Sequence, residues 1–200
     1  MNLFDMNENT RQLPLASRMR PEKLDEIVGQ LHIIGKDKLL YRAIKADRLG
    51  SIILYGPPGV GKTTIARVIA NTTKSYFCKL NATNAGIKDL EKIIEEAKFN
   101  QNAYQKGTIL FIDEIHRLNK VVEEILYPAM EDFCVDVVIG KEASTRSVRI
   151  DLPPFTLVGA TTRAGDLSAP LRDRFGIVSK LEYYSEEELT QIIDRTSRVY

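Results

Sequence analysis

The stretch that decides the fold is the octapeptide Gly56-Pro-Pro-Gly-Val-Gly-Lys-Thr63, which fits the pattern G-x-x-x-x-G-K-[ST]. The apolar run Ile52–Tyr55 before it predicts a strand, and residues Thr63–Asn71 after it predict a helix. Glycines let the intervening loop curl so that successive N–H groups point inward, and the helix N-terminus adds partial positive charge. The octapeptide therefore predicts a phosphate-binding loop. Its place between strand and helix argues against a chance glycine-rich turn.

The lysine and the hydroxyl residue of this loop have separate expected roles. Lys62 is expected to reach the β- and γ-phosphates of a nucleotide, and the Thr63 hydroxyl is expected to bind Mg²⁺. Further contacts to the nucleotide are expected from neighbouring residues of the loop and helix, namely Pro58, Gly59, Val60, Gly61 and Thr64.

A second apolar run is followed directly by two acidic residues. The segment Thr108-Ile-Leu-Phe-Ile-Asp-Glu114 predicts a buried strand that ends in two carboxylates. Ligands of open parallel sheets bind at the carboxyl edge, so Asp113 is expected to hold Mg²⁺, commonly through water, and Glu114 to polarise the attacking water. The alternative is an acidic strand end leading into a helix N-terminus, where Asp and Glu are favoured anyway. Combined with the phosphate loop, the pair favours hydrolysis over nucleotide storage.

Short apolar runs alternate with helical patterns after Pro21, which predicts an α/β layer fold. The runs that predict core strands are Ile52–Tyr55, Tyr76–Leu80, Ile109–Ile112, Thr156–Ala160 and Ile177–Leu181. Apolar residues at helical spacing predict amphipathic helices around residues 87–97 and 122–133, whose stripes are expected to pack in the core.

One segment departs from this alternation. Val135, Val137 and Ile139 alternate with other residues before Gly140, and the alternation resumes at Val148. This pattern predicts a β-hairpin at about residues 135–150, inserted between a helix and the strand at Thr156. Lys141, Arg146 and Arg149 cluster on this hairpin. The pattern leaves open whether the hairpin binds a partner or is only an extension at the edge of the fold.

Bulk composition narrows the classes of protein. The 200 residues carry 28 basic against 27 acidic side chains, a net charge of +1, which argues against nonspecific electrostatic binding of DNA as the main function. The two cysteines are far apart and outside any CxxC pattern, so neither a disulfide framework nor a zinc site is expected. No apolar run approaches the roughly 18 residues of a membrane span. Residues 1–20 lack the apolar region of a signal peptide and predict a flexible arm, so a cytoplasmic location is expected.

These residues also carry a resemblance to a known family. The phosphate loop followed by Asp113-Glu-Ile-His116 resembles the AAA+ ATPases. Residues 1–120 resemble the replication-associated recombination protein A family (RarA, also MgsA) in three stretches: Pro14–Pro21, Leu24–Gln30 and Asn81–Leu90. From about Val121 onward the chain is similar to the RuvB family of Holliday-junction branch-migration motors, in Glu123–Phe133, Asp151–Gly165 and Ser168–Gly176. The two resemblances meet at Phe111–Lys120, which makes a natural or constructed chimera the simplest account.

The resemblance implies an architecture and a domain division. It implies a three-layer α/β P-loop NTPase fold of the AAA+ type, with a parallel five-stranded sheet in the order 5-1-4-3-2 and the inserted hairpin. It places a nucleotide-binding core at residues 21–182 and the beginning of a helical lid at 183–200. We expect the rest of that lid and a DNA-binding winged helix to be missing, so the chain would be a fragment.

Site residues follow from the same resemblance. Thr162 matches the sensor-1 position, which contacts the γ-phosphate or the lytic water. Arg174 matches the arginine finger that is offered to the ATP of the adjacent subunit, and Arg172 is close enough to be confused with it. The residues that match the adenine wall are Arg20, Ile27 and Val28. His116 is expected to be a packing residue.

The resemblance also implies partners and a function. It implies ATP and Mg²⁺ as cofactors, a homo-oligomeric ring that is most often a hexamer, DNA in the form of a junction or fork, and a RuvA-like protein at hairpin 135–150. The leading hypothesis is an ATP-hydrolysing motor domain of DNA recombination and repair, of the branch-migration type, in the bacterial nucleoid. The alternatives are a RarA-like, clamp-loader-type ATPase at stalled replication forks, or a truncated nucleotide-binding module without turnover.

Overall fold

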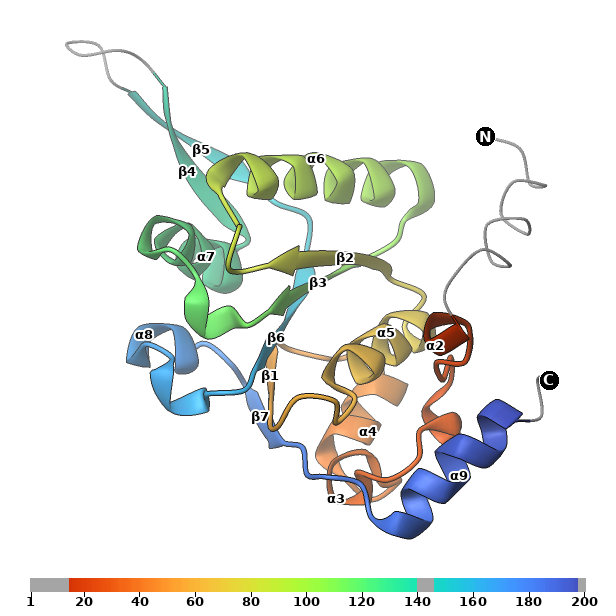
Figure 1. Cartoon of the computed structure of the whole chain (residues 1–200). Helices are drawn as coiled ribbons and strands as arrows, with labels where there is room; N and C mark the ends of the chain where they lie inside the picture. The colour runs from red at the N-terminus through yellow and green to blue at the C-terminus, as the bar shows by residue number, and fades with distance from the viewer. Residues whose placement is uncertain (1–14, 140–145, 198–200) are drawn as a thin grey trace.

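The computed structural model describes residues 15–139 and 146–197 (Figure 1). Most of the arm expected at residues 1–20 therefore lies outside the described residues. Near the end of this segment a short helix, α2, covers Leu15–Arg18. The tetrapeptide Leu-Ala-Ser-Arg begins with two good helix formers.

The centre of the molecule is a parallel sheet of five strands in the order β2-β3-β6-β1-β7. The strands are β1 (Ile52–Tyr55), β2 (Tyr76–Asn81), β3 (Thr108–Asp113), β6 (Phe155–Thr161) and β7 (Ile177–Lys180). Numbered along the chain as core strands, this order is 5-1-4-3-2, which confirms the prediction. The register pairs Asn81 with Asp113 and Tyr55 with Thr161, so the carboxyl ends of these strands lie along one edge of the sheet.

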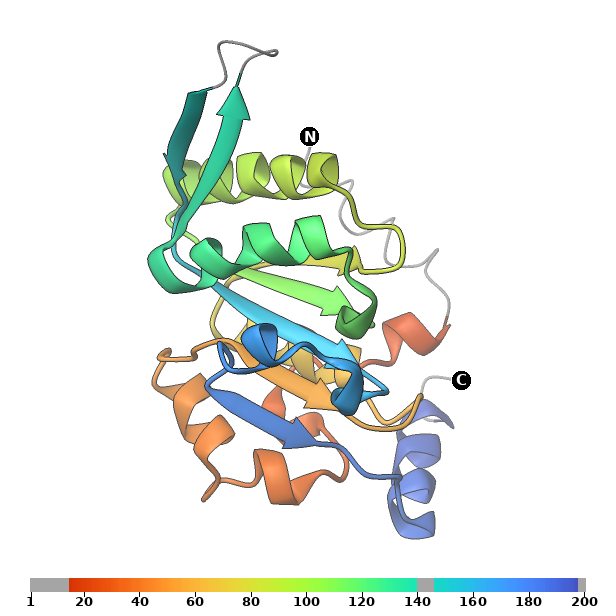
Figure 2. The ribbon, with the colours of Figure 1, turned by 90° about the vertical axis from the view of Figure 1, so that its left-hand side faces the viewer.

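Helices cover both faces of the sheet and complete three layers (Figures 1 and 2). Successive side chains of a strand point to opposite faces, so Ile52 and Leu54 of β1 join one core cluster and Ile53 joins the other. All three are 0% exposed, as expected for a strand covered on both sides.

The two covering layers differ in the part of the chain that supplies them. The first is built from η1 (Leu24–Glu26), α3 (Leu31–Ile34), α4 (Leu39–Lys45) and α5 (Lys62–Thr72). The second is built from α6 (Ile87–Tyr104), η2 (Ile115–Arg117), α7 (Lys120–Asp132), η4 (Ala164–Asp166) and α8 (Ala169–Arg172). Helix α9 (Glu186–Ser197) follows β7, and no helix among the described residues is long and apolar enough to cross a membrane.

The predicted hairpin is present as a separate two-stranded sheet that extends away from the core (Figure 2). Strands β4 (Cys134–Ile139) and β5 (Arg146–Asp151) pair antiparallel, with Val135 opposite Ile150. The connection at 140–145, with Lys141, lies outside the described residues. Arg149 folds back onto the hairpin base, where its guanidinium lies 3.1 Å from Asp132 and donates to the Cys134 sulfur.

Candidate nucleotide-binding site

The glycine loop joins β1 to α5 at the carboxyl edge of the sheet. Gly61 directly precedes α5 with a φ of +93°, a backbone conformation that L side chains rarely adopt. An added Cβ at Gly61 would also lie 2.7 Å from the Tyr184 hydroxyl. The loop can therefore take this shape only with glycine at this position.

Lys62 is the charged group at the centre of the loop. Its side chain is buried, with a residue exposure of 9%, and its Nζ donates to the carbonyls of Gly56 at 2.7 Å and Pro57 at 2.6 Å. Burial lowers the pKa of the Lys62 ammonium below its ordinary value, and the negative charges of Glu114 and Asp113 oppose that effect. The two carboxylates at the end of β3 thus act electrostatically on Lys62.

Asp113 ends β3 and has a partner that the sequence analysis missed. Lys79 of the neighbouring strand β2 places its Nζ 3.0 Å from the Asp113 carboxylate. Lys79 is paired in register with Phe111, so Asp113 is its diagonal neighbour on the same face. Only the register of the two strands, which the sequence does not reveal, brings this lysine to the acidic edge.

Glu114 is held by groups from the next strand and from η2. It has a φ of +52°, and its carboxylate accepts a hydrogen bond from the Thr162 hydroxyl at 3.2 Å. The Nδ1 of His116 lies 3.4 Å from the same carboxylate and is hydrogen-bonded to the Thr161 hydroxyl at 2.8 Å. The structure thus brings Thr162 and Glu114 together. His116, which we expected to be a packing residue, is buried but also belongs to this polar cluster.

A cavity of about 450 Å³ opens beside the loop. Of the residues expected to contact the nucleotide, those that line it are Arg20, Ile27, Val28, Gly59, Gly61 and Thr64. Pro58, Val60, Lys62 and Thr63 do not line it. The cavity therefore joins the expected adenine wall to the loop.

The opposite wall comes from the C-terminal part of the chain and was missed by the sequence analysis. Tyr184, Ile192 and Arg195 line the cavity. The Tyr184 hydroxyl donates to the Val60 carbonyl at 3.2 Å, and burial raises the pKa of Tyr184. Arg195 donates to the carbonyl of Glu26 at 3.0 Å and to its carboxylate at 3.1 Å. These contacts hold the last turn of α9 against η1, and the segment before α9 against the glycine loop.

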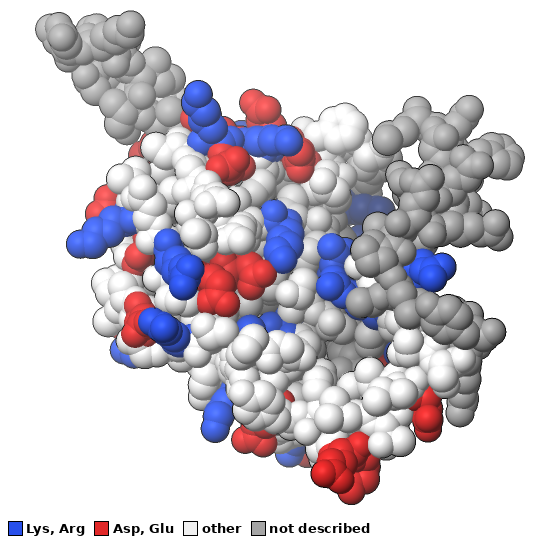
Figure 3. Space-filling view, in the orientation of Figure 1, with Lys and Arg blue, Asp and Glu red and all other residues white. Residues whose placement is uncertain are grey.

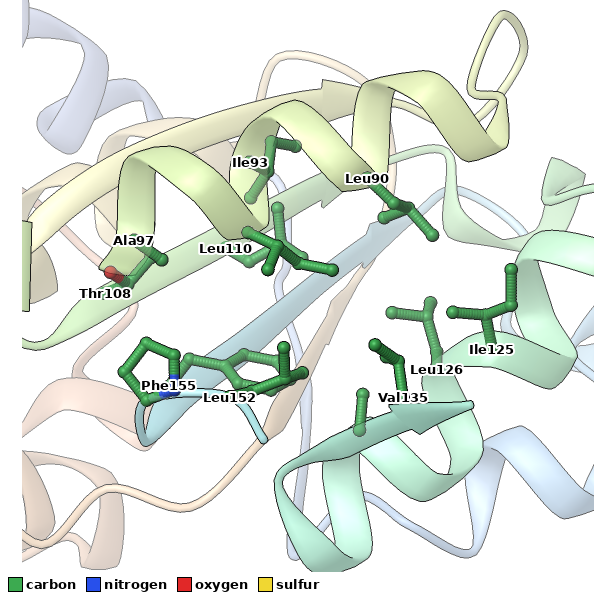
Figure 4. Close-up of a pocket in the computed structure, with 13 residues that line it drawn as sticks. Leu90, Ile93, Ala97, Thr108, Leu110, Ile125, Leu126, Val135, Leu152 and Phe155 are labelled. Carbon is green, nitrogen blue, oxygen red and sulfur yellow. The ribbon is translucent and has the colours of Figure 1, made fainter. Parts of the chain in front are cut away.

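A second cavity, between α6, α7 and the hairpin base, is not a phosphate site (Figure 4). It holds only about 40 Å³, and apart from Thr108 its walls are hydrocarbon side chains such as Leu90, Ile93 and Phe155. Such a lining offers a triphosphate no compensation for its lost hydration. The glycine loop is therefore the candidate site.

Arg174 lies apart from this chain's own loop cavity. It follows α8, its Nη2 lies 2.9 Å from the Glu131 carboxylate of α7, and its guanidinium lies 4.3 Å from the ring centroid of Tyr127. Arg172 is more exposed and lies 3.9 Å from Asp173. Neither arginine lines the loop cavity.

The sheet order, the glycine loop after β1 and the carboxylates at the end of β3 define a P-loop NTPase domain of the AAA+ class. More specifically, the chain belongs to the family described as the Holliday junction DNA helicase RuvB P-loop domain, whose model matches residues 19–181. That match includes residues 111–120, where the two resemblances meet. The resemblance of residues 1–120 to RarA stays a prediction.

Solved structures of RuvB from Thermotoga maritima are similar to this chain. The structure titled Holliday junction branch migration motor is 41% identical, with a TM-score of 0.71, over 90% of this chain and 54% of that chain. A single-substitution variant of the same protein is 42% identical, with a TM-score of 0.73, over 90% of this chain and 55% of that one. This chain thus spans about half the length of the structures that it matches.

Proposed function

We propose that this chain is the ATP-hydrolysing module of a Holliday-junction branch-migration motor. The observation that carries the proposal is the convergence of Lys62, Glu114 and Thr162 at the carboxyl edge of the sheet, in a chain of the RuvB family. Family membership favours DNA recombination as the setting, because the similar T. maritima protein is described as a branch migration motor.

The loop fits a nucleoside triphosphate. The Lys62 ammonium is desolvated and now rests on two loop carbonyls, which triphosphate oxygens would replace as stronger, charged acceptors. Inward-facing amides and the N-terminus of α5 would bind further phosphate oxygens. The base would occupy the cavity between Ile27, Val28 and Tyr184.

The donor set also fits Mg²⁺. Magnesium bound with a nucleotide needs only one or two protein ligands besides water and phosphate oxygens, and the Thr63 hydroxyl and the Asp113 carboxylate would supply them. Among residues 15–139 and 146–197, no group of three or more His, Cys, Asp and Glu side chains is placed to hold a metal alone. When bound, the ion would neutralise negative charge on the phosphate oxygens.

In the proposed reaction, a water oxygen forms a bond to the γ-phosphorus, and the bond from that phosphorus to the bridging oxygen of ADP breaks. Glu114 would orient this water and accept its proton, so its carboxylate must turn from Thr162 and His116 towards the nucleotide. The freed Thr162 hydroxyl would then donate to the γ-phosphate or to the water. Lys62 would remain on the phosphates and stabilise the developing charge.

The remaining positive charge would come from a neighbouring subunit. Arg174 lies outside its own loop cavity, which supports a role in trans. Head-to-tail contacts of identical subunits close into rings when the rotation permits, and we propose a hexameric ring around junction DNA. The face in Figure 3 mixes Lys and Arg with Asp and Glu, without one continuous basic surface, so DNA binding would need specific placement of a few basic residues.

The hairpin at about 135–150 is the proposed contact for a RuvA-like protein. It extends from the core, and its described residues, 134–139 and 146–151, do not line the nucleotide cavity, which supports a role in binding a partner. The proposed setting of the assembly is the nucleoid of a bacterial cytoplasm.

A phosphate-release assay across a protein concentration series tests the proposal. Because the arginine finger acts between subunits, the activity per subunit should rise with concentration, and Arg174→Ala should lower it about 10³- to 10⁵-fold. Arg172→Ala is the matched control and should retain most activity. Activity per subunit that is independent of concentration and unaffected by Arg174→Ala would contradict the proposal.

A further inference from the structure

Polar contacts join α7 to the segment that carries Arg174. Glu123, Tyr127 and Glu131 follow one another at intervals of four residues on α7, which places them on one face of the helix. Each of them contacts the segment from Ser168 to Arg174 or supports a residue that does. We call this row the α7 stripe.

The first part of the stripe fixes the beginning of α8. Glu123 accepts hydrogen bonds from the Tyr127 hydroxyl at 2.6 Å and from the Ser168 hydroxyl. The Ser168 hydroxyl in turn caps α8 by accepting from the Leu171 backbone N–H at 3.3 Å. Glu123 therefore joins the Tyr127 hydroxyl to the N-cap of α8.

The second part of the stripe engages the Arg174 guanidinium. Its Nη2 lies 2.9 Å from Glu131, its Nη1 donates to the Pro170 carbonyl at 2.6 Å, and its Cζ lies 4.3 Å from the centroid of the Tyr127 ring. Its Nε is buried and has no hydrogen-bond partner among the described residues. The side chain is only 24% exposed. In this position Nη1 and Nη2 of the guanidinium are both engaged within this chain.

We propose that Glu131 is a positioning residue that restrains Arg174 against α7 until a neighbouring subunit's triphosphate competes for the guanidinium. This inference rests on the proposed function, in which Arg174 acts in trans. Glu131 is 55% exposed, so its hold on Arg174 is weak enough for a triphosphate with several negative charges to displace it. When the ion pair with Glu131 breaks, the cation–π attraction between the Arg174 guanidinium and the Tyr127 ring would remain and keep the arginine near this position.

The restraint predicts that neutralising Glu131 accelerates the reaction. Glu131→Gln keeps the size of the side chain but removes its charge. In a larger fraction of subunits the Arg174 side chain would then be free to bind the triphosphate of the neighbouring subunit. At a fixed protein concentration, kcat should rise about two- to fivefold, the range that a partly exposed ion pair allows, and KM for ATP should stay unchanged. In an Arg174→Ala background the same substitution should have no effect.

Glu124→Gln is the matched control. Glu124 is an exposed carboxylate of the same helix with no ion pair among the described residues. An equal rise in kcat for Glu124→Gln would overturn the inference, because it would show a general effect of charge on assembly. An unchanged or lowered kcat for Glu131→Gln would overturn it as well, because Glu131 would then not restrain the finger.

A second measurement tests the restraint without turnover. In nucleotide-free protein, the Nε–H NMR signal of Arg174, identified by its loss in Arg174→Ala, should exchange slowly with water because it is buried. Glu131→Gln should speed this exchange, whereas Glu124→Gln should not. Fast exchange in the unmodified chain would sink the inference, whereas absent phosphate release would sink only the proposed function.

Discussion

The substitution Gly56→Ala gives the sharpest test of how the loop is built. Gly56 has a φ of +151°, and an added Cβ would lie 2.4 Å from the Leu181 carbonyl oxygen. That carbonyl cannot easily retreat, because the Leu181 N–H is bonded to the Tyr55 carbonyl at 2.7 Å and the Gly56 N–H to the Thr161 carbonyl at 3.2 Å. The methyl group must therefore displace backbone that the sheet itself holds.

The expected cost has two parts. Overpacking costs about 1–3 kcal/mol, and a residue held in a sparsely populated backbone region costs about 1–3 kcal/mol more. The sum is about 4 kcal/mol at its midpoint. At about 2–4 °C per kcal/mol for a chain of this size, the melting temperature should fall by about 12 °C.

Gly59→Ala is the matched control in the same loop. Gly59 has a φ of +82°, but an added Cβ would meet nothing within 4 Å. Only the backbone term of about 1–2 kcal/mol applies, so Tm should fall by about 4 °C. Thermal unfolding of nucleotide-free protein, followed by circular dichroism, measures both. Equal melting temperatures for the two variants would refute the close contact between Gly56 and Leu181.

Two further predictions concern the acidic edge and the sheet. Glu114→Gln should still bind ATP but release phosphate about 10²- to 10⁴-fold more slowly, since the general base is lost; wild-type turnover in this variant would exclude Glu114 as the base. Burial, followed by the charge of Glu96, raises the pKa of the Cys78 thiol from 9.0 to about 11. Between these pH values the thiol is ionised in the unfolded chain and protonated in the folded chain. The contribution of Cys78 to the free energy of unfolding is therefore fully present below pH 9.0 and is lost as the pH rises towards 11. The loss should reach about 2 kcal/mol, and urea titrations of Cys78→Ala should show a shallower decline over this window; an equal decline would show that Cys78 does not cause it.

Local patterns were enough to predict most of the fold. The five strands and the hairpin follow from short apolar runs, which depend only on neighbouring residues. The glycine loop and the carboxylates of Asp113 and Glu114 were also readable, because strand direction alone brings strand ends to one edge. The strand order was predicted from the family resemblance, because an apolar run does not show which strands lie next to it in the sheet.

The residues that were missed depend on contacts between distant parts of the chain. Gln30 donates to the Glu182 carbonyl at 2.7 Å across 152 residues of sequence, and this contact helps bring Tyr184 to the loop cavity. Lys79 meets Asp113 only because β2 and β3 are in register. His116 was expected only to pack, but its Nδ1 also lies within hydrogen-bond distance of the Thr161 hydroxyl, just after the turn at Glu114. None of these placements has a local signature.

The most direct test of the central claim is calorimetric titration of the nucleotide-free chain with ATP and Mg²⁺, compared with Lys62→Ala. The variant should fold, because it removes an ammonium that burial disfavours, as the lowered pKa of Lys62 shows. The unmodified protein should bind one nucleotide per chain saturably, and Lys62→Ala should bind none. Equal affinity in a correctly folded Lys62→Ala variant would contradict it.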